Sequence, residues 1–174
     1  MKYLTLLFLL LGWCQYDLAF AVDNKPPTMW NIQHETKELI IRKDILNQLK
    51  KELQLTTNST NQITIAGLPG MGKTQLAKQY AKFFNRNYSI VWWFDDTTDL
   101  TFQFVRFAKE LQKNFYIPKQ KEADLNDNQE ALQQAKNFLR TTTEPWLLIF
   151  DNVNSLDTIE PFFPNINKLL MLTL

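Results

Sequence analysis

Three of the four glycines in this 174-residue chain lie in one short stretch, AGLPGMGKTQ, at positions 66–75. They are Gly67, Gly70 and Gly72, and Lys73 and Thr74 follow directly. Glycine permits positive φ angles and close approach of the backbone to a ligand, so such a loop can turn its N–H groups inward around an anion. The stretch matches the pattern G-x-x-x-x-G-K-[ST] of phosphate-binding loops, also called P-loops or Walker A motifs. We therefore predict that these five residues bind the phosphates of a nucleotide.

The residues around the last glycine have separate roles in this chemistry. Lys73 is expected to reach the β- and γ-phosphates, and the Thr74 hydroxyl is expected to bind Mg²⁺. Met71 and Gln75 would flank the phosphates through their backbone. A helix that begins near Lys73 would add its unpaired N–H groups and the positive end of its dipole.

A second motif follows later in the chain, at 146–152, with the sequence WLLIFDN. An apolar run that ends in an acid has the Walker B form, in which a buried strand delivers a carboxylate beside the phosphates. Asp151 is predicted to hold Mg²⁺, directly or through water, and Lys73 and Asp151 are the predicted catalytic residues. Asn152 stands where many P-loop ATPases carry a second acid, and an amide cannot accept the proton of an attacking water. Either the base comes from elsewhere or hydrolysis is slow.

Hydrophobic periodicity indicates the elements that must position these residues. Short apolar or β-branched runs predict strands over 63–66, 89–94 and 146–150. Apolar residues at three- and four-residue steps predict helices over 38–55, 73–84, 99–115 and 129–141. Strands that alternate with helices form a parallel sheet covered on both faces, so the fold class is α/β.

The charge balance and the cysteine content of the chain limit which ligands and cross-links it can have. The chain has 19 basic and 18 acidic residues, a net charge of +1, and no dense basic block, so we expect no nucleic-acid partner. Cys14 is the sole cysteine, which excludes a disulfide within the chain.

The N-terminus has the order of a secretory signal. Lys2 precedes an apolar run over 4–11, and Ala19-Phe20-Ala21 offers a cleavage site between small residues. The run is shorter than the roughly 20 residues that span a bilayer. We predict a signal peptide or hydrophobic leader over 1–21 and a linker over 22–36. An uncleaved anchor and a misassigned start codon are alternatives. The leader indicates export and a nucleotide site indicates the cytoplasm, so the localisation stays open.

Three stretches, IAGLPGMGKTQLAKQYA, VWWFDD and WLLIFDNV, resemble the NB-ARC nucleotide-binding domain of the STAND class of P-loop NTPases. The resemblance is greatest to bacterial members that often carry tetratricopeptide repeats, and it covers about residues 37–165. It implies a three-layer αβα sandwich that binds ADP or ATP with Mg²⁺. It also implies a signalling switch that ADP holds closed, ATP opens for assembly and slow hydrolysis resets. Self-assembly and protein partners would depend on parts beyond this chain.

The segment IIRKDILNQLKKEL, 40–53, is similar to the family's segment before the P-loop, which helps to cover the adenine. Arg42 matches its arginine, and Ile41 stands where glycine is usual. The resemblance implies that Arg42 contributes to nucleotide binding.

The C-terminus departs from the family, which continues after Walker B with a strand that carries a sensor arginine, a fifth strand and two further subdomains. Here no arginine follows Arg140, and LLMLTL, 169–174, could imitate the sensor strand or be a frameshifted tail. We expect 37–174 to be a truncated domain, with the strands after Walker B largely missing and hydrolysis weak or absent. A complete minimal nucleotide binder is one alternative. Another is a secreted or membrane-attached remnant that acts only as an interaction module or is inactive. The third, an AAA-type ATPase fragment, is disfavoured by Asn152.

Overall fold

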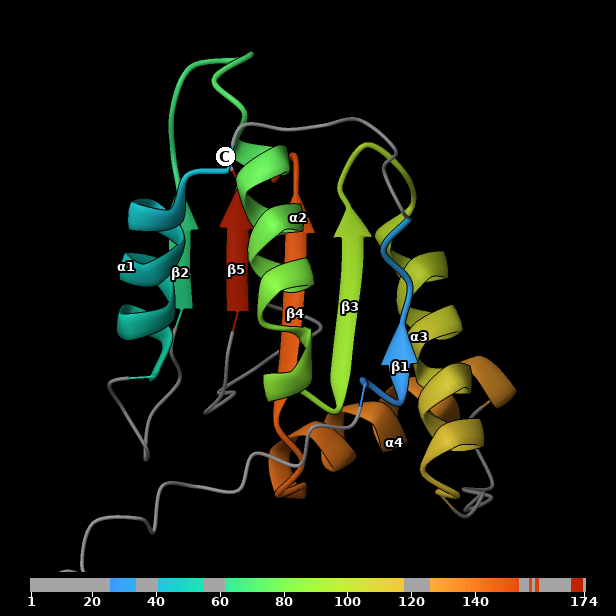
Figure 1. Cartoon of the computed structure of the whole chain (residues 1–174). Coiled ribbons are helices and arrows are strands. Elements are labelled where there is room, and N and C mark those ends of the chain that lie inside the picture. Colours follow the sequence, from blue (N-terminus) through green and yellow to red (C-terminus); the bar gives the residue numbers. More distant parts are fainter. Residues whose placement is uncertain are drawn as a thin grey trace, which may run out of the picture.

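A computed structural model of the chain describes residues 26–33, 41–54, 62–117, 126–153, 157, 159 and 170–173. The leader predicted over 1–21 lies outside these residues. The described part forms a parallel β-sheet with helices on both faces (Figure 1). The predicted α/β class and three-layer arrangement are therefore confirmed.

Strands and helices alternate along most of the described chain. The strands are β1 (Met29–Trp30), β2 (Gln62–Ile65), β3 (Ile90–Asp95), β4 (Trp146–Asp151) and β5 (Leu170–Thr173). The helices are α1 (Lys43–Gln54), α2 (Lys73–Phe83), α3 (Leu100–Asn114) and α4 (Asp127–Thr141), with a 3₁₀ turn η1 (Asn85–Asn87) after α2. The predicted strands and helices thus occur with shifts of one or two residues at their ends, except that the first helix begins at Lys43 and not at residue 38.

The order of strands across the sheet is β1-β3-β4-β5-β2, and all neighbouring pairs are parallel. Strand β5 therefore separates β2, which leads into the glycine loop, from β4, which ends in Asp151. Because the strands are parallel, their carboxyl ends share one edge of the sheet, which is where open α/β folds bind ligands.

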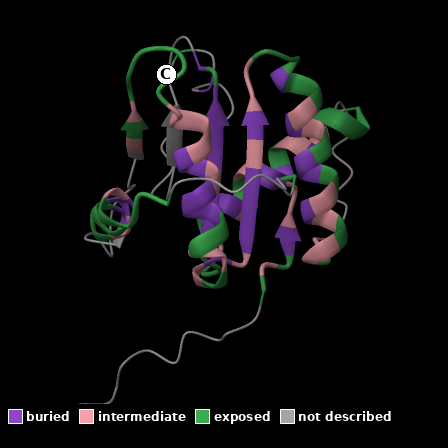
Figure 2. Ribbon diagram, turned by 45° about the horizontal axis from the view of Figure 1, so that its top comes forward, coloured by how far each residue is buried: buried purple, intermediate pink, exposed green. Residues whose placement is uncertain are grey.

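Strand β3 shows how the two faces of the sheet are covered. Ile90, Trp92 and Phe94 pack in the core formed with α3 and α4. Val91 and Trp93 belong to the core formed with α1 and α2. This alternation follows from the two-residue period of a strand. The central strands β3 and β4 are largely buried (Figure 2), as expected when helices cover both faces.

Side-chain caps mark the residues at which α3 and α4 begin. The Asp99 carboxylate accepts hydrogen bonds from the backbone N–H groups of Thr101 and Phe102 at the start of α3. At the start of α4, Asn126 and Gln129 form a reciprocal capping box. Each cap satisfies backbone donors that a helix cannot satisfy internally, and is worth about 1 kcal/mol.

Part of the predicted linker belongs to the sheet. Met29 and Trp30 form β1, which pairs with β3, so the prediction of a linker over 22–36 is wrong for these two residues. The ladder continues through a side chain: Asn31 Nδ2 donates to the Trp93 carbonyl at 2.9 Å, and Asn31 Oδ1 accepts from the Trp93 N–H at 2.7 Å. A two-residue strand is too short for periodicity to indicate, and its pairing is a tertiary contact.

One strand follows Walker B in the described residues. Residues 170–173, within the LLMLTL stretch, form β5 and pair with both β4 and β2. This pairing shows that part of the stretch forms a strand, as the first of its two alternatives supposed, and it does not test whether the stretch is a frameshifted tail. No helix within the described ranges is long and apolar enough for a membrane span.

Candidate functional site

The glycine loop connects the carboxyl end of β2 to α2 (Figure 1). Gly70 has a φ of 82° and Gly72 a φ of 83°, so both lie in the left-handed region that other residues rarely adopt. Gly67 differs, since a Cβ there would meet Met71 Sδ at 3.6 Å, an ordinary contact. The shape of the loop therefore requires Gly70 and Gly72, whereas the backbone of Gly67 has no positive φ and a Cβ would fit there without a clash.

The Lys73 ammonium lies against this loop. Its Nζ donates to the carbonyl oxygen of Gly67 at 2.9 Å and to that of Leu68 at 3.2 Å. An ammonium has three donors and no acceptor. The side chain is thus held over the loop, where it can exchange carbonyl oxygens for phosphate oxygens.

The start of α2 is open to an anion. Gly72 is the N-cap, so no side chain caps the helix, and the first turn contains no acidic residue. The positive end of the helix dipole and the N–H groups of the first turn are the features that bind phosphate at other helix N-termini. Gln75, which was predicted to flank the phosphates, lies in this turn and is half-buried.

Thr74 and Asp151 come together at this edge of the sheet. Thr74 Oγ1 donates to Asp151 Oδ1 at 3.1 Å. The Asp151 side chain is buried, with 4% of its surface exposed. A hydroxyl and a carboxylate are hard oxygen ligands suited to Mg²⁺, which commonly takes one or two protein ligands and completes its shell with phosphates and water. No group of three or more His, Cys, Asp or Glu side chains arranged for a metal occurs among the described residues.

Two other predicted residues lie at the margin of the site. Met71 is 58% exposed, and its N–H donates to the Leu68 carbonyl at 3.3 Å within the loop. Arg42 is exposed directly before α1, whose start lies at the same edge of the sheet as the loop (Figure 1). The structure brings the residues from Gly67 to Gln75 together with Asp151, but records no hydrogen bond of the Arg42 side chain to them.

Sequence reasoning assigned no role to Asp95, the last residue of β3. Its Oδ1 accepts hydrogen bonds from Asn152 Nδ2 at 3.0 Å, from the Thr97 N–H at 3.0 Å and from Thr97 Oγ1 at 2.8 Å. Burial raises the pKa of Asp95, but the hydrogen bonds from Asn152 and Thr97 and the charge of Lys78 outweigh it, so the pKa lies below its usual value. The signal was present in the sequence, because VWWFDD ends a parallel strand in an acid, as WLLIFD does.

Asn152 has an unusual backbone. Its φ is 60°, in the left-handed region that asparagine tolerates better than most residues. Its N–H donates to Asp151 Oδ1 at 3.1 Å, while its side-chain amide donates to Asp95. The residue after Walker B therefore connects the carboxylates at the ends of two neighbouring strands.

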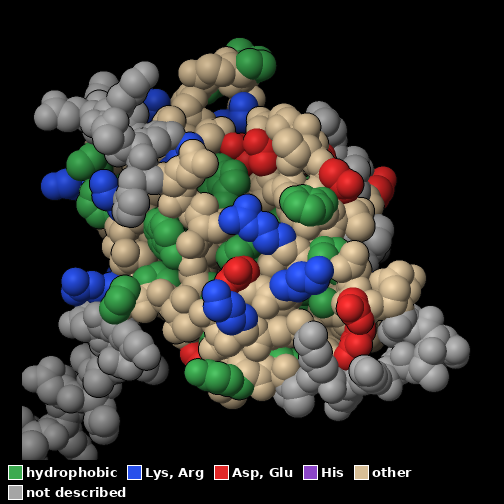
Figure 3. All heavy atoms as spheres, turned by 90° about the vertical axis from the view of Figure 1, so that its right-hand side faces the viewer, with side chains coloured by type: hydrophobic (Ala, Val, Ile, Leu, Met, Phe, Trp, Pro, Cys, Tyr) green, Lys and Arg blue, Asp and Glu red, His purple; other side chains and the backbone are tan. Residues whose placement is uncertain are grey.

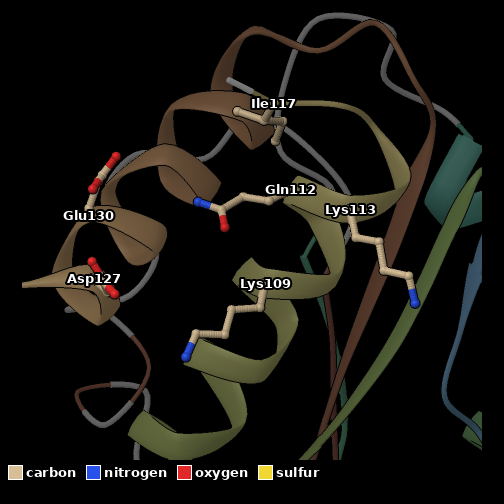
Figure 4. Close-up of a pocket in the computed structure, with 6 residues that line it drawn as sticks. All are labelled: Lys109, Gln112, Lys113, Ile117, Asp127 and Glu130. Atoms are coloured by element: carbon tan, nitrogen blue, oxygen red, sulfur yellow. The ribbon is translucent and has the colours of Figure 1, made fainter. Parts of the chain in front are cut away.

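A separate pocket lies between α3 and α4 (Figure 4). Its lining residues are Lys109, Gln112, Lys113, Ile117, Asp127 and Glu130. Helices α3 and α4 cover the face of the sheet opposite α2. The pocket lies at the C-terminal half of α3, and this helix begins near the carboxyl end of β3 and leads away from it. Two lysines and two carboxylates balance its charge, so it lacks the basic character of a phosphate site.

The surface on the β1 and α3 side carries mixed charge. Figure 3 shows basic, acidic and hydrophobic side chains interspersed on this face rather than gathered into one basic patch. The expectation of no nucleic-acid partner stays a prediction.

Comparison with known proteins agrees with this geometry. The family model described as the NB-ARC domain matches residues 42–173, a range that begins at Arg42 and ends in β5. Among solved structures, Cdc6p from Pyrobaculum aerophilum is similar in fold, with a TM-score of 0.54 and 16% sequence identity. The similarity covers 82% of this chain but only 41% of Cdc6p. Comparison with curated protein sequences finds no match. Because the family model spans most of its length, the chain belongs to the NB-ARC domain family of P-loop NTPases.

Proposed function

We propose that this chain binds ADP or ATP together with Mg²⁺ at the loop between β2 and α2. The single observation that carries the proposal is the hydrogen bond between Thr74 Oγ1 and Asp151 Oδ1. This bond joins the first turn of α2 to the end of the Walker B strand, β4. It forms although β5 lies between β4 and β2, the strand that leads into the glycine loop. A purely structural glycine turn would not need a buried carboxylate at this position.

The residues present fit both ligands. The left-handed Gly70 and Gly72 shape the loop, Lys73 supplies a positive charge and the uncapped start of α2 supplies N–H groups for the phosphates. Thr74 and Asp151 would hold Mg²⁺, which when bound neutralises charge on the phosphate oxygens. Gly67, Met71 and Gln75 would line the phosphates through their backbone, and Arg42 would approach the nucleotide from the start of α1.

We further propose that the domain serves a signalling switch of the STAND class, of the bacterial type associated with tetratricopeptide repeats. The resemblance of the P-loop, second strand and Walker B stretches supports this assignment. Hydrolysis would be slow compared with P-loop ATPases that carry an acid directly after Walker B, since Asn152 is an amide and cannot itself accept a proton from the attacking water. Such a switch depends on the bound nucleotide and not on rapid turnover.

Calorimetric titration of the full chain with ADP and with ATP, each with and without Mg²⁺, tests the proposal. We expect one site with a Kd well below about 1 mM, equivalent to more than about 4 kcal/mol of binding free energy. Lys73→Ala should weaken binding by at least tenfold. Lys109→Ala, which removes the same charge from α3 on the opposite face, is the matched control and should bind like the parent.

Two results would contradict the proposal. Absence of binding in the millimolar range would favour the alternative of an interaction module without nucleotide activity. Equal binding by Lys73→Ala and the parent would mean that the nucleotide site lies elsewhere.

A further inference from the structure

Two carboxylates end neighbouring strands at the proposed nucleotide site. Asp95 on β3 and Asp151 on β4 are partners in the parallel register. Two residues earlier on each strand, Trp93 and Ile149 contact the core on the α1 and α2 side. Since strand side chains alternate with a period of two, Asp95 and Asp151 both belong to the face that carries α2 and the glycine loop.

Hydrogen bonds fix the Asp95 carboxylate in one orientation. All three bonds to this group reach the same oxygen, Oδ1, and come from Asn152 and Thr97. In the described part of the chain, the other oxygen, Oδ2, accepts no hydrogen bond. A carboxylate held by one oxygen presents its second oxygen as an oriented acceptor.

The backbone of Asp95 is held as well. Gln103 Oε1 accepts from the Asp95 N–H at 3.0 Å, and Gln103 Nε2 donates to the Asp95 carbonyl at 2.8 Å. The same Nε2 donates to Thr98 Oγ1 at 2.7 Å. Gln103 of α3 thus holds the backbone of Asp95, while Asn152 orients its carboxylate. Functional side chains require such support from neighbouring residues to keep one geometry.

We propose that Asp95 is the second acidic residue of this site: its free carboxylate oxygen accepts a hydrogen bond from the water that attacks the γ-phosphate of ATP, and Asn152 is its positioning residue. The proposal rests on the proposed nucleotide site. In the reaction the water oxygen bonds to the γ-phosphorus while the bond from that phosphorus to the β–γ bridging oxygen breaks. The products are ADP and inorganic phosphate: one water proton stays on the attacking oxygen, and the other passes to another oxygen of the released phosphate.

The residue types support this assignment. The acid that many P-loop ATPases carry directly after Walker B is an amide here, and the acid stands instead at the end of the adjacent strand. The amide and the acid are hydrogen bonded to each other at 3.0 Å. Positions 95 and 152 therefore contain one carboxylate and one amide, with the carboxylate at the end of β3 and the amide directly after β4.

Single-turnover ATP hydrolysis by the full chain, with nucleotide affinity and thermal stability measured on the same samples, tests the proposal. Asp95→Asn should lower the hydrolysis rate by about 100-fold. This factor is the lower end of the effect expected when a group that assists proton transfer is removed. ADP affinity should stay within about threefold and Tm within a few degrees, because the amide keeps the size of the side chain. Asp96→Asn removes the same charge one residue later and should hydrolyse ATP like the parent.

The exchanged pair, Asp95→Asn with Asn152→Asp, tests the positioning role. It retains one donor and one acceptor between the strand ends and places the carboxylate at position 152, directly after β4. We expect the exchanged pair to hydrolyse ATP at least tenfold faster than Asp95→Asn does. An exchanged pair as slow as the single variant would overturn the role of Asn152.

The outcomes separate this inference from the proposed function. If Asp95→Asn hydrolyses ATP at the parental rate, or if the parent binds ATP without hydrolysing it, Asp95 has no catalytic role while the nucleotide site stands. If Asp95→Asn loses rate, ADP affinity and Tm together, its role is structural. If the parent binds no nucleotide, the proposed function itself fails.

Discussion

The Thr74 hydroxyl donates a hydrogen bond to the Asp151 carboxylate across 3.1 Å, although 77 residues separate them in the chain. Thr74 lies in the first turn of α2, and Asp151 ends β4. Helix α2 packs on the face of the sheet that contains Leu147 and Ile149 of β4, so its first turn lies beside the carboxyl end of that strand. The contact defines where a phosphate-bound Mg²⁺ would be held.

Asp151→Asn should remove most of the gain in ATP affinity that Mg²⁺ provides, because an amide oxygen carries no full charge for the cation. Calorimetry with and without Mg²⁺ measures this gain directly. Affinity in EDTA should stay near the parental value, since the P-loop contacts are unchanged. If Mg²⁺ raises the ATP affinity of Asp151→Asn as much as that of the parent, Asp151 does not hold the metal.

The glycines of the loop should separate into two classes. Gly72→Ala places a side chain at a φ of 83° and should lower the free energy of unfolding by about 1–2 kcal/mol. Gly67→Ala meets only ordinary contacts, so it should leave stability nearly unchanged while weakening nucleotide binding. Urea unfolding and calorimetry distinguish the two effects. Equal losses of stability in both variants would contradict the described loop.

Asn31→Ala should destabilise the edge of the sheet by about 1–3 kcal/mol, because it leaves the N–H and carbonyl of Trp93 without their side-chain partner. Urea unfolding of the full chain measures the loss. Asn137→Ala on the exposed side of α4 is the control and should not destabilise. If Asn31→Ala unfolds like the parent, β1 does not contribute to the stability of the sheet.

The buried tyrosine pair should make the chain sensitive to alkali. The Tyr80 and Tyr88 hydroxyls are hydrogen bonded at 2.8 Å. Burial raises the pKa of Tyr80 to about 12, although the hydrogen bond to Tyr88 lowers it somewhat. Burial, and then the charge and hydrogen bond of Tyr80, raise the pKa of Tyr88. The folded state thus holds protons that the unfolded chain releases near pH 10.

The sign of the effect follows from linkage. A pKa raised by folding contributes stability that is complete below the unfolded pKa, near 10, and is lost as the pH rises toward the folded value of about 12 for Tyr80. The free energy of unfolding, measured by urea between pH 8 and 11.5, should therefore fall above pH 10. The double variant Tyr80→Phe with Tyr88→Phe should fall less steeply, and equal slopes would refute the assignment.

Much of this protein could be predicted from its sequence because the relevant signals are local. The spacing from Gly67 to Thr74 specifies a glycine turn that leads into a helix, and the apolar runs before Asp95 and Asp151 specify buried strands. The same stretches indicated the NB-ARC family, which the match over 42–173 confirms. These features depend on residues within about ten positions of one another.

Which of these local elements meet depends on contacts between distant parts of the chain. The position of β5 between β4 and β2, the pairing of Met29 and Trp30 with β3, and the hydrogen bond from Asn152 to Asp95 all join distant parts of the chain. The strand order results from how the crossover connections pack helices on both faces of the sheet, and this packing joins segments far apart in the chain. Local spacing was enough to predict a phosphate-binding loop and a Walker B acid, whereas the pairing of β3 with β4 places a second carboxylate, Asp95, beside Asp151.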